Sequence, residues 1–157
     1  MQNKESIWAD GCPKNVKEEY KLTTQELLLL AVDYVVKQYA MKNGFKVEQA
    51  MARIEYLPNI IMRKNDILYA VAVVPFVYPK YAHLNNEVRI KFVNDAKGYN
   101  AVPLFAPVGF KSIDKERAKA SMALKGDLFD VLFRGFIKLT DEPNQQMLIP
   151  NNEFLRL

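Results

Sequence analysis

Residues 58–77 read PNIIMRKNDILYAVAVVPFV, and this stretch decides the fold class. From Ile67 onwards the residues are almost all β-branched, aromatic or aliphatic, which is typical of a strand covered on both faces of a sheet. Residues 58–63 form a shorter run of similar character, and residues 64–66 between the two runs favour a tight turn. We therefore predict two antiparallel strands, with Pro75 ending the pairing of the second or placing its end at a sheet edge.

A long helix is predicted before this hairpin, from about residue 24 to residue 43. Residues 23–26 have the form of a capping box, with Thr23 at the N-cap and Glu26 at the third helical position. Gly44 follows, where a helix takes its left-handed C-terminal stop. Since the helix is apolar on several faces, we expect it to be largely buried.

The remaining elements complete an α/β pattern. They are a strand over 45–53, which forms a meander with the strands at 58–63 and 67–74, a helix from Asn85 or Asn86 to Gly98, a strand over 101–109, a short helix over 112–119 and a strand over 131–139. The order α-β-β-β-α-β plus a C-terminal strand predicts a mixed sheet flanked by helices on both faces. The predicted core includes Leu27, Leu30, Val35, Val71, Val73, Phe92, Leu104 and Ile137.

Length and composition indicate one soluble globular domain. Half of the 157 residues are apolar and a quarter are charged. We expect an N-terminal arm over residues 1–22 and a single domain over 23–157. No uninterrupted apolar run is long enough for a membrane span and no signal peptide is visible, so we predict a cytoplasmic protein without a membrane partner.

Charge and residue counts exclude several kinds of site. The net charge is +4, with 22 basic and 18 acidic residues, which is compatible with nucleic acid without requiring it. Cys12 and His83 are the only cysteine and histidine, so no intramolecular disulfide, iron–sulfur cluster or structural zinc site is expected. The six glycines form no dinucleotide-binding or phosphate-binding loop. The sequence therefore predicts no cofactor and no bound metal.

The order of elements resembles the core of the restriction-endonuclease-like superfamily, the PD-(D/E)xK nucleases. In that family a Pro-Asp opens the second core strand, and a Glu-x-Lys or Asp-x-Lys lies on the third. Pro58-Asn59 resembles the first half-motif, and residues 69–74 lie where the second would be. The resemblance covers residues 24–109 and implies a restriction-endonuclease-like fold.

The catalytic positions of that family are changed in this chain. Asn59 stands at the position of the aspartate, Ala72 at that of the glutamate and Val74 at that of the lysine. The family's chemistry needs carboxylates to hold a divalent cation and a lysine to position or activate the attacking water. The resemblance therefore implies a degenerate relative with no catalytic residues, which is not an enzyme.

Displaced carboxylates are the alternative, since some branches of the superfamily recruit acids from neighbouring elements. The candidates are Glu26, Glu48, Glu55 and Asp66. Each also has an ordinary local explanation, as a helix cap, a turn residue or a solvated side chain.

Two segments are candidates for nucleic-acid binding. Residues 111–125 hold five basic and two acidic residues, and the candidate phosphate ligands are Lys111, Lys115, Arg117 and Lys119. Residues 78–83, YPKYAH, place aromatic rings beside a base and form a candidate stacking platform. A solvated helix face explains the basic segment equally well, and aromatic residues beside prolines more often pack such a loop onto the domain. Arg134, next to Gly135, cannot be interpreted alone.

We expect a non-enzymatic binding module on a degenerate nuclease-like scaffold, with either nucleic acid or a protein as its partner. One alternative is a metal-dependent nuclease with migrated acidic residues. The other is a structural module that self-associates as a homo-oligomer through apolar surface.

Overall fold

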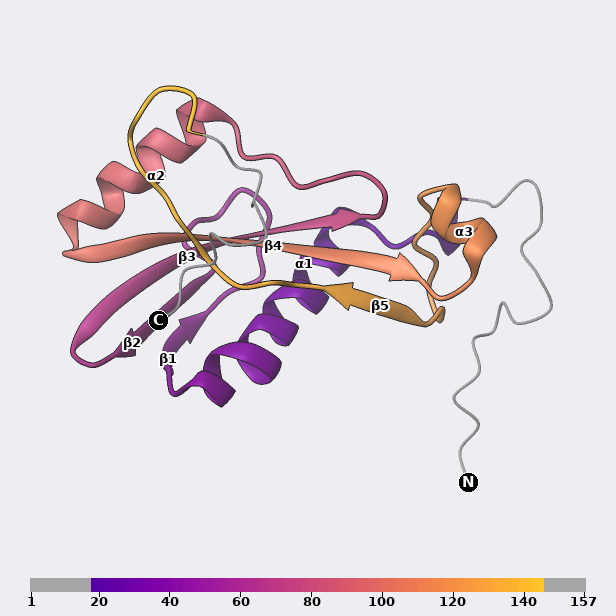
Figure 1. Ribbon diagram of the computed structural model, residues 1–157, viewed down its shortest axis with the longest axis horizontal. Coiled ribbons are helices and arrows are strands. Elements are labelled where there is room, and N and C mark those ends of the chain that lie inside the picture. Colours follow the sequence, from indigo (N-terminus) through magenta and orange to yellow (C-terminus); the bar gives the residue numbers. More distant parts are fainter. Residues whose placement is uncertain (1–17, 146–157) are drawn as a thin grey trace.

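The computed structural model describes residues 18–145 of the chain (Figure 1). Its elements are η1 (Glu18–Tyr20), α1 (Thr24–Tyr34), η2 (Val35–Ala40), η3 (Met41–Asn43), β1 (Lys46–Ala50), β2 (Ile60–Lys64), β3 (Ile67–Val77), α2 (Asn86–Gly98), β4 (Ala101–Ser112), α3 (Lys115–Lys119), β5 (Phe129–Leu132) and β6 (Ile137–Lys138). The predicted α/β class is confirmed.

The strands form one mixed six-stranded sheet. Its order is β1-β2-β3-β4-β5, and β6 pairs with β4 outside this path. The three N-terminal strands form the predicted antiparallel meander, whereas β3 and β4 are parallel. Helix α2 makes the crossover that this parallel pair requires. β5 and β6 then return antiparallel to β4.

The start and the stop of the first helix are confirmed. The Thr23 hydroxyl accepts a hydrogen bond from the Glu26 backbone N–H at 3.1 Å, and the Glu26 carboxylate accepts one from the Thr23 N–H at 3.0 Å. Gly44 adopts a φ of 83° at the other end. Between them, α1 continues into the π-helical η2 and the 3₁₀ turn η3. The prediction that Leu30 belongs to the core is wrong, since this side chain is 44% exposed on the outer side of α1.

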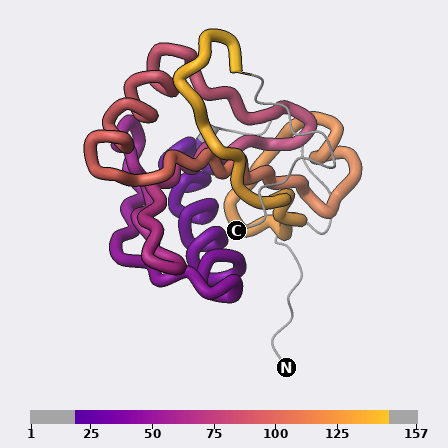
Figure 2. Tube along the Cα trace, turned by 60° about the vertical axis from the view of Figure 1, so that its left-hand side comes forward, coloured from indigo at the N-terminus to yellow at the C-terminus, as the bar shows by residue number. Residues whose placement is uncertain are grey.

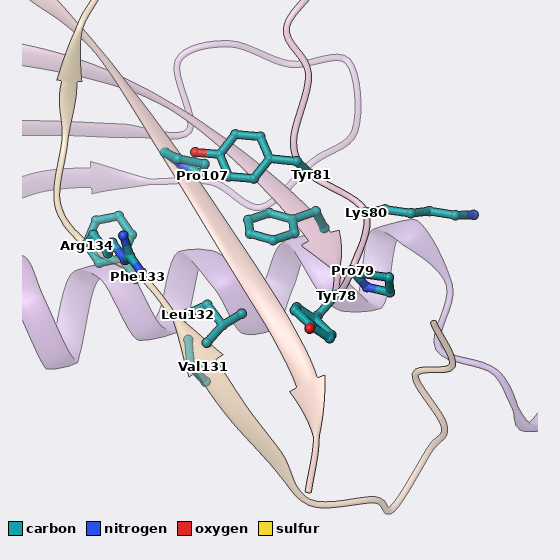
Figure 3. Close-up of a pocket in the computed structure, with 10 residues that line it drawn as sticks. Tyr78, Pro79, Lys80, Tyr81, Pro107, Val131, Leu132, Phe133 and Arg134 are labelled. Atoms are coloured by element: carbon teal, nitrogen blue, oxygen red, sulfur yellow. The ribbon is translucent and has the colours of Figure 1, made fainter. Parts of the chain in front are cut away.

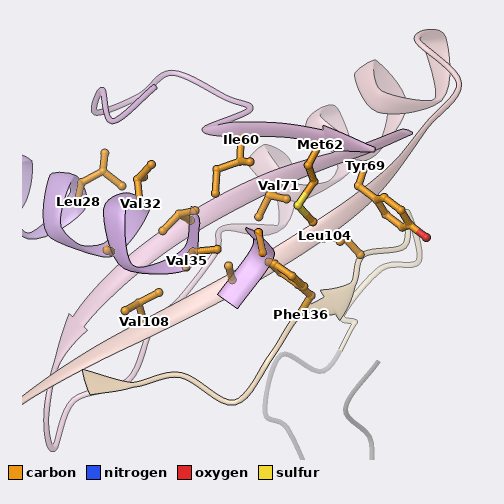
Figure 4. Packing of buried hydrophobic residues seen from close by; sticks show 14 of the residues in the cluster. Leu28, Val32, Val35, Ile60, Met62, Tyr69, Val71, Leu104, Val108 and Phe136 are labelled. Carbon is orange, nitrogen blue, oxygen red and sulfur yellow. The ribbon is translucent and has the colours of Figure 1, made fainter. Parts of the chain in front are cut away.

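The sheet separates two hydrophobic cores, as expected for a strand covered on both faces. Val71 and Val73 of β3 pack in the cluster that includes α1 (Figure 4). Ala70 and Ala72 alternate with them and pack in the cluster that includes Phe92 of α2. The two helices therefore cover opposite faces of the sheet (Figure 1).

The end of β3 projects beyond β2. β2 pairs with β3 only from Ile67 to Val71, whereas β4 follows β3 as far as Val77. Pro75 therefore lies where β3 has a single strand neighbour, which agrees with the predicted edge position, and the strand continues past it. This projecting end carries part of the candidate site described below.

The predicted strand over 131–139 is two short strands. Gly135 has a φ of 118°, a conformation that extended L-residues do not adopt, and it lies between β5 and β6. The chain beyond β6 runs beside α2 (Figure 2), where the buried guanidinium of Arg89 donates hydrogen bonds to the carbonyls of Thr140 and Glu142. The sequence analysis did not identify Arg89 as a buried residue.

The last residues of the predicted N-terminal arm are paired with the domain. The Leu22 N–H donates to the Ala123 carbonyl, and the Lys125 N–H donates to the Tyr20 carbonyl, both at 2.8 Å. The rest of the arm, including Cys12, lies outside the described residues. In the described range 18–145, no helix is long and apolar enough to cross a membrane.

Candidate functional site

Asn59 is a buried structural residue immediately before β2. Asn59 is only 2% exposed. Its side-chain amide oxygen accepts a hydrogen bond from the Val73 N–H at 2.8 Å. Its amide nitrogen donates to the carbonyls of Met51 and Tyr56, each at 3.2 Å. These three bonds join the β1–β2 connection to β3. An ionised aspartate has no hydrogen to donate, so it could not make two of the three.

Ala72 and Val74, the other two positions of the expected motif, lie on β3 close to Asn59. Ile60 pairs with Val71, so the antiparallel register continues from Asn59 to Ala72. Ala72 is fully buried and Val74 is partly buried, and both belong to the apolar cluster on the α2 face. The structure thus brings the three positions together. Two of the three side chains are hydrocarbon and the third is an amide held by backbone groups.

The four candidate migrated acids do not form one cluster. Glu26 caps α1, and its carboxylate lies 3.8 Å from Lys125 Nζ, while Glu48 forms a 3.0 Å ion pair with Arg63. Glu55 and Asp66 are exposed residues with positive φ. Within residues 18–145, no group of three or more His, Cys, Asp or Glu side chains is placed to hold a metal ion.

Arg117 does not fit the predicted role of a phosphate ligand. It is 3% exposed, and its Nε and Nη2 atoms bond the two carboxylate oxygens of Asp127 at 2.8 and 3.1 Å. Ser112 Oγ donates to the same carboxylate at 2.8 Å. The buried Arg117–Asp127 ion pair connects α3 to the segment before β5. The neighbouring candidates Lys115 and Lys119 are exposed on α3.

A pocket of about 500 Å³ lies at the projecting end of β3, on the sheet face opposite α1 (Figure 3). Its lining residues come from β3, the β3–α2 loop, β4 and the segment from β5 towards β6, and they are Phe76, Tyr78, Pro79, Lys80, Tyr81, Pro107, Val131, Leu132, Phe133 and Arg134. The structure thereby joins two features that are far apart in the sequence, the candidate stacking platform and Arg134.

Aromatic rings make up a large part of the pocket lining. The rings of Phe76 and Tyr81 lie 4.9 Å apart between centroids, at an interplanar angle of 42°. Tyr78 and Tyr81 remain 38% and 43% exposed, so both rings offer surface to a ligand. A Cβ atom at Gly109 would lie 2.4 Å from the Phe76 ring, so the glycine allows this ring to lie across β4.

The pocket is bordered by positive charge. Lys80 and Arg134 line it, and Lys111 Nζ lies 4.5 Å from the centre of the Tyr78 ring. None of the ten lining residues is acidic. Partial burial raises the pKa of the Tyr81 hydroxyl above its usual value, and the charge of Arg134 acts in the opposite direction. Lys111 is thus the member of the predicted basic segment that reaches this site.

The tip of the α3 region also approaches the pocket. Ser121 Oγ donates a 3.1 Å hydrogen bond to the Val77 carbonyl, immediately before Tyr78.

Phe76 and Gly109 were missed by the sequence analysis, because their roles depend on the pairing of β3 with β4. No local pattern in the sequence marks either residue.

A family model described as a domain of unknown function, DUF8840, matches residues 25–139. This range extends from the first turn of α1 to the residue after β6, and it includes every residue that lines the pocket. No curated protein and no solved structure matches the chain.

Proposed function

The chain belongs to the family described as a domain of unknown function, DUF8840, and we propose that it is a non-enzymatic nucleic-acid-binding module on a restriction-endonuclease-like scaffold. The arrangement of α1, the β1–β3 meander, α2 and β4 supports the scaffold, because it is the order that the resemblance implies. Fold alone does not determine function, so the proposal depends on the local chemistry of the site.

The residues at the degenerate motif support a loss of catalysis. The Asn59 amide is committed to three backbone groups, and Ala72 and Val74 contribute to the core under α2. A divalent cation at this place would meet neither a carboxylate nor a lysine from these three positions. The positions that would carry catalysis in a nuclease instead stabilise the sheet.

One observation carries the choice of nucleic acid over a protein partner: exposed aromatic rings and basic side chains share one pocket without an acidic residue in its lining. Nucleic acids present π faces and phosphates within a few ångströms of each other, and proteins bind them by stacking and by charge. The pocket follows Val74 on the same strand of the sheet, so binding and the degenerate motif occupy neighbouring parts of β3.

The test is a binding titration of a fluorescently labelled oligonucleotide, followed by anisotropy between about 50 and 200 mM salt. We expect binding that weakens as salt rises. The double variant Lys80→Gln and Lys111→Gln should bind at least about 10-fold more weakly and have a shallower salt dependence, with a slope smaller by about 1–2. The control is Lys46→Gln with Lys91→Gln, which removes the same charge from exposed lysines on β1 and α2.

Three results would contradict the proposal. The first is no binding by the wild-type protein at low salt, and the second is an equal loss in the control variant. The third is magnesium- or manganese-dependent cleavage that Glu48→Gln or Glu55→Gln abolishes, which would favour a nuclease with migrated acids. If the first result is accompanied by a concentration-dependent dimer, it would favour the self-association module.

A further inference from the structure

The pocket at the end of β3 has the size and lining of a small-ligand site. Its volume of about 500 Å³ falls within the range of about 300–1,000 Å³ that is typical of such sites. The lining combines aromatic rings and two prolines, which form flat apolar surfaces, with cationic side chains. A planar aromatic group that carries a negative charge nearby matches this lining.

The rings are held in place by the sheet. Phe76 belongs to the last part of β3 and lies against the backbone of Gly109 in β4, and Tyr81 packs on Phe76 from the following loop. A ligand that stacks on Tyr81 therefore meets a supported surface. Little side-chain freedom remains to be lost on binding, which favours affinity.

The cationic side chains surround the stacked pair of Phe76 and Tyr81. Lys111 Nζ lies over the ring of Tyr78, 4.5 Å from its centre, and Lys80 extends from the loop away from the stacked rings (Figure 3). A phosphate attached to a stacked base would therefore find its partners at the edge of the pocket. In a polynucleotide each base is joined through its sugar to such a phosphate.

Paired and unpaired bases differ in how they could use this site. In a duplex each base lies between its neighbours, and its faces are not available to a protein ring. In a single strand every base can present a π face to an aromatic side chain. The exposed ring of Tyr81 therefore suits an unpaired base.

We propose that this pocket receives an unpaired nucleobase with its adjoining phosphate, so that the protein prefers single-stranded nucleic acid to duplex. The inference rests on the proposed nucleic-acid function and adds the class of ligand. Stacking makes the preference tolerant of base identity, because each base has a π face.

The test compares three probes of equal length: a single strand, its duplex and a single strand built of abasic sites. The abasic probe has the same phosphate charge but offers nothing to stack. We expect the wild-type protein to bind the single strand at least about 10-fold more tightly than the duplex or the abasic probe. RNA and DNA versions of the strand are titrated in parallel, and a nucleoside monophosphate is added as competitor to detect a free-nucleotide site.

Two variants test whether the preference for single strands depends on the Tyr81 ring. Tyr81→Leu keeps apolar volume but removes the π face, and it should lower single-strand affinity on the order of 10-fold without changing duplex binding. Tyr99→Leu is the matched control, since Tyr99 is 73% exposed at the end of α2. Circular dichroism verifies that both variants are folded.

The outcomes separate the two proposals. Equal binding of single strand, duplex and abasic probe, with no effect of Tyr81→Leu, would overturn the base pocket and leave charge-driven binding intact. Displacement of the strand by low concentrations of a nucleoside monophosphate would also overturn the strand preference, in favour of a nucleotide site. Failure of every nucleic acid to bind would refute both proposals.

Discussion

Replacing Asn59 by aspartate should destabilise the protein, although aspartate is the residue that the proposed nuclease resemblance would place there. The carboxylate can still accept the Val73 N–H, but it cannot donate to the carbonyls of Met51 and Tyr56. Both carbonyls belong to a partly buried loop, so losing their donor costs about 1 kcal/mol each. Desolvation of a carboxylate at this buried position adds about 1–2 kcal/mol. We therefore expect the free energy of unfolding to fall by about 3–4 kcal/mol at pH 7.

The pH dependence gives this prediction a second readout. Burial without an opposing charge raises the pKa of a carboxyl group, so Asp at position 59 should titrate above its unfolded value of about 3.9. The folded variant then binds a proton before the unfolded chain does. The variant's loss of unfolding free energy relative to wild type should be largest above the folded pKa. This loss should shrink as pH falls through that pKa and be smallest below about pH 4.

Urea unfolding of wild type and variant at neutral and at mildly acidic pH measures both effects. Asn94→Asp, on the exposed side of α2, makes the same change of charge and should cost no more than about 0.5 kcal/mol. If Asn59→Asp is as stable as this control at pH 7, the two donated hydrogen bonds are not important. The structural explanation for asparagine at this position would then be refuted.

Three further predictions follow from single side chains. Gly109→Ala should force the Phe76 ring away from β4, changing the near-ultraviolet circular dichroism and weakening single-strand binding about as much as Tyr81→Leu does; an unchanged spectrum and affinity would contradict the pocket geometry. Arg117→Gln should destabilise the fold by about 3–5 kcal/mol in urea titrations because it leaves a buried carboxylate unpaired, and a variant as stable as wild type would restore Arg117 as a candidate surface ligand. The hydrogen bonds from Thr23 lower the pKa of Glu26, so its cap should stabilise the protein above the unfolded pKa and be lost as pH falls through the folded pKa; a carboxyl resonance that titrates at the ordinary value would contradict this.

Local chemistry explains which parts of the fold could be predicted. The capping box at Thr23 and the stop at Gly44 depend on residues within one helical turn, and both are where the sequence places them. The strand at 67–77 is recognisable because burial on both faces leaves a continuous apolar run. Leu30 was misplaced because the sequence shows several apolar faces on this helix and does not say which one meets the sheet.

The candidate site depended on contacts that sequence spacing does not reveal. Arg117 is an ordinary helix residue until Asp127, ten positions later, folds back to pair with it. The pocket joins residues 76–81 with residues 131–134, and only the parallel pairing of β3 with β4 and the return of β5 bring them together. The sequence marked the aromatic loop and Arg134 as separate features, and their union required the topology.

The most direct test of nucleic-acid binding at this pocket is a titration of isotope-labelled protein with a short single strand, followed by amide resonances at low salt. We expect the largest shifts at Tyr78, Lys80, Tyr81 and the residues 131–134, and little change at Leu29 and Leu30 on the outer side of α1. Saturating shifts at the pocket would support the proposed function. No shifts, or shifts confined to α1 and the β1 edge, would contradict it.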